Sequence, residues 1–242
     1  EVVSDVNGVC HAEYVPEKIE EYLRKHPRFQ KIGIVLSGDT GFYSGAKKLE
    51  EVLKKSEETY EVQRIPGISS VVYFAARLHT SWEDAALVSL HGRRQNWVFA
   101  VEHHAKTFLL LGGKTENLKE KLLYYGLGDV TVHIGKNFSY PEEQIYSKPA
   151  GELLAEDTGG LCIAYLENPD PCEKVCRHLK DEEFIRGKVP MTKEEVRTIC
   201  LAKLELTKDA VLYDVGAGTG SVAIEAACQD GRIRVYAIEK NP

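Results

Sequence analysis

The sequence predicts an α/β protein made of two successive α/β domains. From residue 31 onward, short apolar runs alternate with amphipathic stretches, which is the pattern of strands that alternate with helices. Between residues 167 and 188 this pattern gives way to charged residues and two prolines, as at a domain boundary. After residue 189 the pattern resumes, now with a glycine-rich turn between a predicted strand and a predicted helix. These three observations define the fold class.

The first predicted domain opens with two strand–turn–helix segments and a further strand. Apolar residues at helical spacing follow the first glycine turn, and Ser69 or Ser70 is placed to cap the second helix. In chain order, the expected elements are a strand at 31–36, a turn at 37–41, a helix at 42–53, a strand at 60–65, a turn at 66–67, a helix ending at 78 and a strand at 86–90.

Strands dominate the next part of the chain. Several of them are joined by short turns, so we expect a second lobe with a mixed sheet. The expected elements are helices at 96–104 and 116–125 and strands at 107–111, 130–134, 144–147 and 161–166.

The last part begins with a predicted helix and ends in a strand–turn–helix–strand segment. Thr192 and Glu195 have the spacing of a capping box ahead of an apolar helical pattern. The expected strands lie at 210–215 and 233–238, with a helix at 221–228 between them, and Glu239 follows the second strand.

Composition and charge narrow the function classes. Hydrophobic residues make up 43% of the chain, which is enough for two modest cores, and no apolar run approaches the roughly 20 residues of a membrane span. The N-terminus has no secretory pattern, so we expect a cytoplasmic protein. The net charge of −6 argues against general affinity for nucleic acid. The cysteines are expected to be reduced, and Cys172, Cys176 and His178 do not match zinc spacing, so no metal is predicted.

The turn at 214–221, Asp-Val-Gly-Ala-Gly-Thr-Gly-Ser, carries the strongest chemical signal. Its glycines let the backbone approach a nucleotide-like ligand, but Ser221 stands where a dinucleotide site requires glycine. Asp214 would repel a pyrophosphate and attract the sulfonium and ammonium groups of S-adenosylmethionine. Glu239 can accept hydrogen bonds from ribose hydroxyls. The alternative is a turn that only permits a tight strand–helix connection.

Two sets of residues resemble known methyltransferases. Residues 189–193 (Val-Pro-Met-Thr-Lys), 195–197 (Glu-Val-Arg) and 214–221 resemble the opening of CbiT-type precorrin methyltransferases, over residues 189–242. Residues 37–44 (Ser-Gly-Asp-Thr-Gly-Phe-Tyr-Ser) and 66–70 (Pro-Gly-Ile-Ser-Ser) resemble CbiE-type members of the tetrapyrrole methylase superfamily, over residues 1 to about 168. In this order the two resemble the fused precorrin-6Y C-5,C-15-methyltransferases of cobalamin biosynthesis, which methylate both carbons and decarboxylate an acetate side chain.

The resemblance implies a two-lobed tetrapyrrole methylase fold followed by the start of a Rossmann-like class I methyltransferase domain. The implied domains are an N-terminal lobe at 1–105, a C-terminal lobe at 106–168, a linker at 169–188 and the partial domain at 189–242. The implied cofactor is S-adenosyl-L-methionine, and the matched cofactor-binding positions are Gly38, Asp39, Phe42, Ser69, Ser70, Leu111, Thr192, Gly216, Ala217, Gly218, Thr219, Gly220 and Glu239. For Asp39, an N-cap on a helix at Phe42 is an equally good interpretation.

The chain also departs from the two families. No glycine-proline-glycine loop precedes Ser37, and the class I domain stops two strands in. We therefore expect a chain truncated at both ends. Unless a partner chain supplies the rest of the second site, we expect neither methylation at carbon 15 nor decarboxylation from this chain alone. Relatives of the CbiE type imply a homodimer.

An acidic enzyme needs local cations to hold a carboxylate-rich precorrin. His91, Arg93 and Arg94 follow the strand at 86–90 and are the expected substrate-binding residues; the alternative is a solvated charged loop. Methyl transfer needs no covalent nucleophile, and no catalytic residue is predicted. Two other functions stay open, namely a superfamily methyltransferase acting on another substrate such as RNA, and a non-catalytic module that only binds S-adenosylmethionine.

Overall fold

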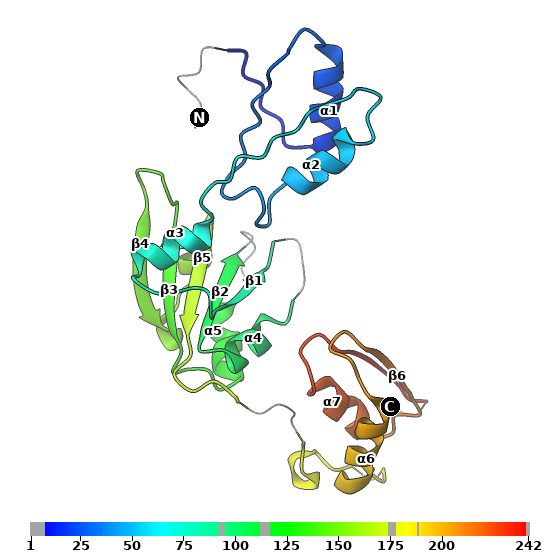
Figure 1. Cartoon of the computed structure of the whole chain (residues 1–242). Coiled ribbons are helices and arrows are strands. Elements are labelled where there is room, and N and C mark those ends of the chain that lie inside the picture. The colour runs from blue at the N-terminus through cyan, green and yellow to red at the C-terminus, as the bar shows by residue number, and fades with distance from the viewer. Residues whose placement is uncertain (1–7, 92–94, 112–116, 174–177, 188, 241–242) are drawn as a thin grey trace. The chain divides into compact units, whose positions relative to one another are not determined.

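The computed structural model describes residues 8–91, 95–111, 117–173, 178–187 and 189–240, and the chain divides into two compact units, Glu1–Thr80 and Ser81–Pro242. Helices and strands alternate along most of the chain, so the predicted α/β class is confirmed (Figure 1). Among the described residues, the helices are all too short or too polar to cross a membrane.

Over residues 8–80, the described part of the first unit, the chain forms three helices, α1 (Pro16–Lys25), α2 (Ala46–Leu53) and α3 (Ser70–Arg77). A small apolar core joins α1 to α2 through Leu23, Leu49 and Leu53. Helix α1 is absent from the sequence-based expectations, although proline at its first position and basic residues in its last turn are typical helix signals. Helix α2 begins at Ala46 instead of Phe42, because Tyr43 has a positive φ of 47° that breaks the helical backbone.

The expected strands at 31–36 and 60–65 are not formed. Both segments lack ladder hydrogen bonds, and several of their apolar side chains are exposed, among them Ile34 at 40% and Val62 at 49%. A β-branched composition favours an extended backbone, but a strand also needs a neighbour with which to exchange hydrogen bonds. The described part of the first unit contains no such neighbour.

The second unit contains the expected mixed sheet. Its order is β1-β2-β5-β3-β4, with β1 and β2 parallel and the other neighbours antiparallel. The strand expected at 86–90 therefore lies in the same sheet as the strands of the second lobe, and the lobe boundary at residue 105 stays a prediction. The strands are β1 (Ala86–Ser89), β2 (Lys106–Leu111), β3 (Thr131–Lys136), β4 (Gln144–Pro149) and β5 (Cys162–Glu167).

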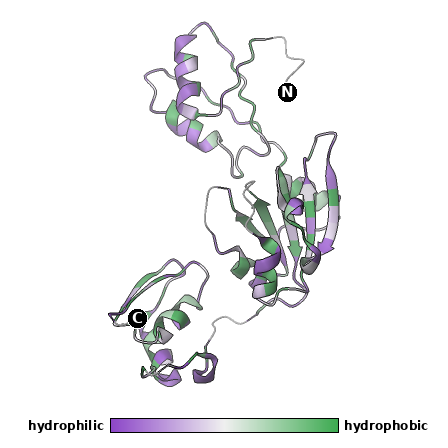
Figure 2. Cartoon of the chain, turned by 180° about the vertical axis from the view of Figure 1, so that it is seen from behind, coloured by the Kyte–Doolittle hydropathy of each residue, from purple (hydrophilic) through white to green (hydrophobic). Residues whose placement is uncertain are grey.

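One face of this sheet is covered by α4 (Trp97–His103) and α5 (Leu118–Tyr124) (Figure 1). Trp97 and Leu122 pack there against alternate residues of the central strands, such as Leu109 and Ile134. The edge strand β4 consists mostly of hydrophilic residues, whereas the central strands of the sheet are mainly hydrophobic (Figure 2), in keeping with the partial exposure of β4. The described residues of this unit also form three short 3₁₀ turns: η1 (Ala150–Glu152), η2 (Ala155–Thr158) and η3 (Asp181–Glu183).

A buried carboxylate holds the chain after β4. Asp157, 4% exposed, accepts hydrogen bonds from Lys148 Nζ and Tyr146 Oη at 2.9 Å and from the Leu154 N–H at 2.7 Å. Burial by itself would raise the pKa of Asp157, but these hydrogen bonds outweigh it and the pKa lies below its ordinary value. The ionised carboxylate therefore stabilises this turn.

The C-terminal part follows the predicted order of elements. Helix α6 (Glu194–Leu204) precedes β6 (Val211–Val215), α7 (Ser221–Ala227) and β7 (Arg234–Ile238). The two strands are parallel neighbours, in register from Val211 opposite Arg234 to Val215 opposite Ile238. The result is one β–α–β unit with the glycine turn at the carboxyl end of β6.

Candidate functional site

In the first unit, the two motifs at 37–41 and 66–70 lie against each other. A Cβ atom on Gly67 would overlap with the carbonyl oxygen of Gly38, and Gly38 itself has a φ of +74°. Glycine is therefore needed at both positions, at one for close approach and at the other for a left-handed backbone. This contact brings Gly38 and Asp39 next to the loop that leads to Ser69 and Ser70.

The polar side chains of these loops are used locally. Asp39 Oδ1 accepts a hydrogen bond from the Gly41 N–H at 2.6 Å, which closes a tight turn. The interpretation of Asp39 as the N-cap of a helix at Phe42 is wrong, because α2 starts at Ala46. Ser69 is the N-cap of α3 and accepts from the Val72 N–H at 3.2 Å, while Ser70 is the first residue of that helix.

Of the remaining expected positions of the tetrapyrrole methylase part, Phe42 directly follows the 37–41 loop, and the others lie farther along the chain. Phe42 packs edge-on against Tyr43, with ring centroids 4.8 Å apart. Leu111 is 4% exposed and belongs to the apolar cluster of the mixed sheet. His91 is exposed, and Arg93 and Arg94 lie outside the described residues. Their roles in binding stay predictions.

In the C-terminal part, the structure explains why glycine recurs in the turn after β6. Gly216, Gly218 and Gly220 have φ values of +80°, +56° and +71°, which other residues rarely adopt. The Gly216 and Ala217 N–H groups donate to the Ile238 carbonyl at 2.8 and 3.2 Å, so the turn is fastened to the end of β7. Thr219 lies between these glycines and lines a surface cavity.

Two carboxylates flank this turn. Glu239 Oε2 accepts a hydrogen bond from the Gly218 N–H at 2.8 Å, which places the acid at the end of β7 across from the glycines. Asp214 Oδ2, at the end of β6, is buried and has no hydrogen-bond partner among the described residues. An unpaired buried carboxylate oxygen is costly unless a ligand supplies a donor or a positive charge. The pair therefore fits a ligand with hydroxyls and a cationic group, as S-adenosylmethionine has.

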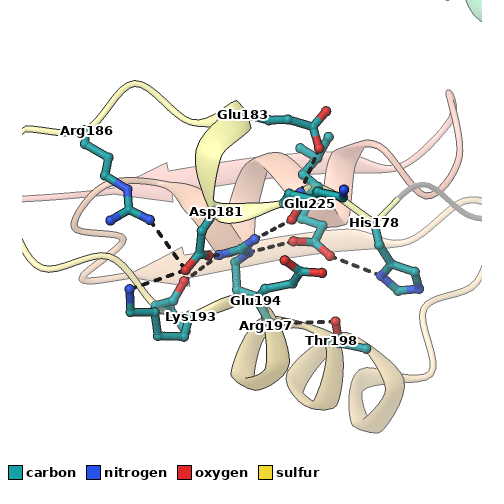
Figure 3. A network of polar contacts seen from close by, with 12 residues as sticks. His178, Asp181, Glu183, Arg186, Lys193, Glu194, Arg197, Thr198 and Glu225 are labelled. Atoms are coloured by element: carbon teal, nitrogen blue, oxygen red, sulfur yellow. Dashed lines mark hydrogen bonds and ion pairs between the residues drawn. The ribbon is translucent and has the colours of Figure 1, made fainter.

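Arg197 on α6 joins three segments around this unit (Figure 3). Its guanidinium donates to Glu225 Oε2 on α7 at 2.6 Å, to Asp181 Oδ1 at 2.7 Å and to the Thr192 carbonyl at 2.6 Å. The expected capping box of Thr192 and Glu195 is not formed, because Lys193 is the N-cap and makes no side-chain cap. Arg197 instead binds the Thr192 carbonyl and so fixes the backbone at that position.

Burial and ion pairing act in opposite directions on Arg197. Burial would lower the pKa of the guanidinium, but the hydrogen bonds that it donates to Glu225 and Asp181 outweigh this effect and raise the pKa. The hydrogen bond from Arg197 also lowers the pKa of Asp181. Both pKa shifts favour the ionised forms of Arg197 and Asp181 at neutral pH.

The C-terminal part has two parallel strands joined through a glycine turn and a helix, with an acid at the end of the second strand. These are the opening elements of a Rossmann-like fold. Comparison with known proteins agrees. Residues 6–154 match the family of Tetrapyrrole (Corrin/Porphyrin) Methylases, and residues 183–242 match the family described as Precorrin methyltransferase domain. Because the first match covers more than half of the chain, this protein belongs to the tetrapyrrole methylase family, and its expected fold is confirmed.

Three similar proteins carry related names. The precorrin-6Y C(5,15)-methyltransferase [decarboxylating] of Sinorhizobium sp is 26% identical over 89% of this chain and 52% of its own length. The cobalt-precorrin-6B C(15)-methyltransferase (decarboxylating) of Salmonella typhimurium is 62% identical over 26% of this chain and 34% of its own length. The X-ray structure of the cobalt precorrin-4 methyltransferase CbiF has a TM-score of 0.51 and 19% identity, covering 66% of this chain and 72% of that one. The chain thus spans about half of the first relative and a third of the second.

Three basic residues of this region were not predicted as site residues from the sequence. Arg197 reads as an ordinary helical position, and its burial results from contacts with Glu225 and Asp181 that are distant in the sequence. Arg186 and Lys193 line the cavity beside Thr219, but they resemble solvated charges when read from the sequence alone. Lys193 and Arg197 belong to the segments that carry the resemblance to CbiT-type proteins, but residue spacing assigns a role to none of the three.

Proposed function

We propose that this chain forms part of an S-adenosylmethionine-dependent precorrin methyltransferase of cobalamin biosynthesis. Its tetrapyrrole methylase part would methylate carbon 5, and the C-terminal domain, when complete, would methylate carbon 15 and assist decarboxylation. The name of the Sinorhizobium relative, which aligns with most of the chain, supports both assignments. A homodimer and a cytoplasmic location belong to the same proposal.

The arrangement of Glu239, Gly218 and Asp214 is the observation that carries the proposal. Glu239 lies against the glycine turn, where its carboxylate can accept hydrogen bonds from ribose hydroxyls. The unpaired Asp214 oxygen suits the ammonium or sulfonium group of the same ligand. The glycines leave room for close approach, since a Cβ on Gly216 would meet no atom within 4 Å.

The residues of this chain act by binding and alignment. S-adenosylmethionine supplies a methyl group on a positively charged sulfur, so the protein needs no covalent nucleophile. Its tasks are to hold the methyl donor and a nucleophilic carbon in line and to exclude water. The Gly38–Gly67 loop pair is the corresponding candidate in the first unit, because it brings together the two motifs that the resemblance assigns to cofactor binding.

Calorimetric titration with S-adenosylhomocysteine tests the proposal. Gly218→Val should abolish binding at the C-terminal turn, since a β-branched residue cannot easily adopt its positive φ. Asp39→Asn should weaken binding at the first site while it keeps the oxygen that accepts from Gly41. Gly151→Ala is the matched control, because a Cβ there meets no atom within 4 Å. A wild-type chain that binds no S-adenosylhomocysteine would refute the proposal.

A further inference from the structure

A cavity of about 350 Å³ opens beside the C-terminal glycine turn. Its wall includes Arg186, Val189, Pro190, Met191, Lys193 and Thr219. We propose that this cavity binds one carboxylate-bearing edge of an acidic tetrapyrrole, with Arg186 and Lys193 as the groups that hold the carboxylate. This inference rests on the proposed function and names the substrate contacts of its second site.

The cavity adjoins the turn that is proposed to hold the methyl donor. Thr219 belongs to both, and a Cβ atom on Gly218 would lie 3.8 Å from Val189 Cγ1. A substrate edge in the cavity would therefore lie next to the cofactor. Such proximity is the main requirement of a direct methyl transfer.

Asp181 lies next to both Arg186 and Lys193 but does not use all of their hydrogen-bond donors (Figure 3). Asp181 Oδ1 accepts from Arg197 at 2.7 Å, whereas Oδ2 faces Lys193 Nζ at 3.4 Å and Arg186 Nη2 at 3.6 Å. These two distances exceed the roughly 2.7–3.2 Å of a good hydrogen bond. Two half-exposed cations thus share one carboxylate oxygen, and they have donors suited to a further carboxylate.

The segment that carries these residues is anchored. Arg197 donates to the Leu179 carbonyl at 2.5 Å and lies over the Phe184 ring at 4.7 Å. The Lys180 N–H donates to Glu183 Oε2 at 2.7 Å. An anchored cation loses less entropy when it binds a ligand than a cation on a free loop.

The rest of the wall suits the ring of a tetrapyrrole. Val189, Pro190 and Met191 offer apolar surface beside the two cations. This combination matches the edge of a macrocycle, which has an apolar pyrrole ring and acetate or propionate groups attached to it. The volume lies at the lower end of the range for small-molecule sites, so the cavity takes one edge of the macrocycle and not the whole.

The test uses uroporphyrin III, a stable fluorescent tetrapyrrole with an acetate and a propionate on every pyrrole ring. Binding to the full chain is measured by fluorescence quenching. The double variant Arg186→Gln/Lys193→Gln should bind roughly tenfold more weakly, with a smaller salt dependence. Lys203→Gln removes an exposed charge of α6 that is not part of the cavity and should bind like wild type.

A charge-preserving variant and the cofactor titration keep the test decisive. The double variant Arg186→Lys/Lys193→Arg keeps both positive charges and should retain most of the affinity for uroporphyrin. If the glutamine variant instead lost affinity because substitutions at these positions unfold the protein, the charge-preserving variant would lose affinity too. The inference is overturned if wild type fails to bind uroporphyrin, or if the glutamine variant binds it as tightly as wild type. Failure of the proposed function is a separate result, namely a wild-type chain that does not bind S-adenosylhomocysteine.

Discussion

Replacement of Arg197 by methionine should destabilise the C-terminal part of the chain, α6 to β7, by about 3 kcal/mol. The side chains of Arg197 and Glu225 are both 0% exposed, so the substitution leaves a buried carboxylate without its principal cation. Removal of one partner from a buried ion pair costs about 3–5 kcal/mol. We take the lower end, because His178 Nδ1 lies 3.2 Å from the other Glu225 oxygen and can compensate in part.

Hydrogen exchange measured by mass spectrometry on peptides of α6 and α7 gives the local opening free energy directly. The expected loss corresponds to roughly a hundredfold faster exchange. The double variant Arg197→Met/Glu225→Met should recover much of it, since paired apolar replacements of a buried ion pair are often neutral. Arg232→Met removes an exposed ion pair with Asp230 and serves as the control.

Two results would refute this reasoning. One is an Arg197→Met variant that exchanges no faster than Arg232→Met. The other is a double variant whose loss equals the sum of the two single losses, because the buried pair would then carry no coupling energy.

Three further outcomes are expected. Gly67→Ala should cost the first unit about 2 kcal/mol by urea unfolding, because its Cβ overlaps with the Gly38 carbonyl; an unchanged midpoint would contradict the loop contact. Burial raises the pKa of Cys162 to about 11, so iodoacetamide at neutral pH should alkylate the exposed Cys10 and leave Cys162 unmodified in the mass spectrum. Asp157→Asn should cost about 2 kcal/mol at neutral pH. Because the folded-state pKa of Asp157 lies below the ordinary 3.8, its contribution is complete above that value and is lost as the pH falls through the lowered pKa. Tryptophan fluorescence in urea should therefore show a variant that is less sensitive to acid than wild type.

The sequence predicted correctly those elements that depend on nearby residues, and it failed for those that depend on contacts with distant parts of the chain. The β6–α7–β7 segment was predicted almost to the residue, because its glycines, apolar runs and terminal acid all lie within one short stretch. The strands expected at 31–36 and 60–65 failed for the opposite reason. Their composition suits a strand, but the hydrogen bonds that define one come from a neighbouring chain segment.

The candidate site divides in the same way. The glycines at 216, 218 and 220 and the carboxylate of Glu239 followed from residue type and order. Other local roles depended on the exact residue at which a helix starts, which sequence patterns place only to within a few residues. These are the turn closed by Asp39, the cap made by Ser69 and the missing cap at Thr192.

The sequence by itself determined the family, the α/β class and the position of the glycine turn between β6 and α7, since all three depend on local residue patterns. Only the tertiary structure decided that Arg197 is buried, that Asp181 holds Arg186 and Lys193, and that these two line a cavity beside Thr219. Burial and ion pairing depend on which distant segments meet, and the free energy of a charge depends on its surroundings more than on its neighbours in the chain.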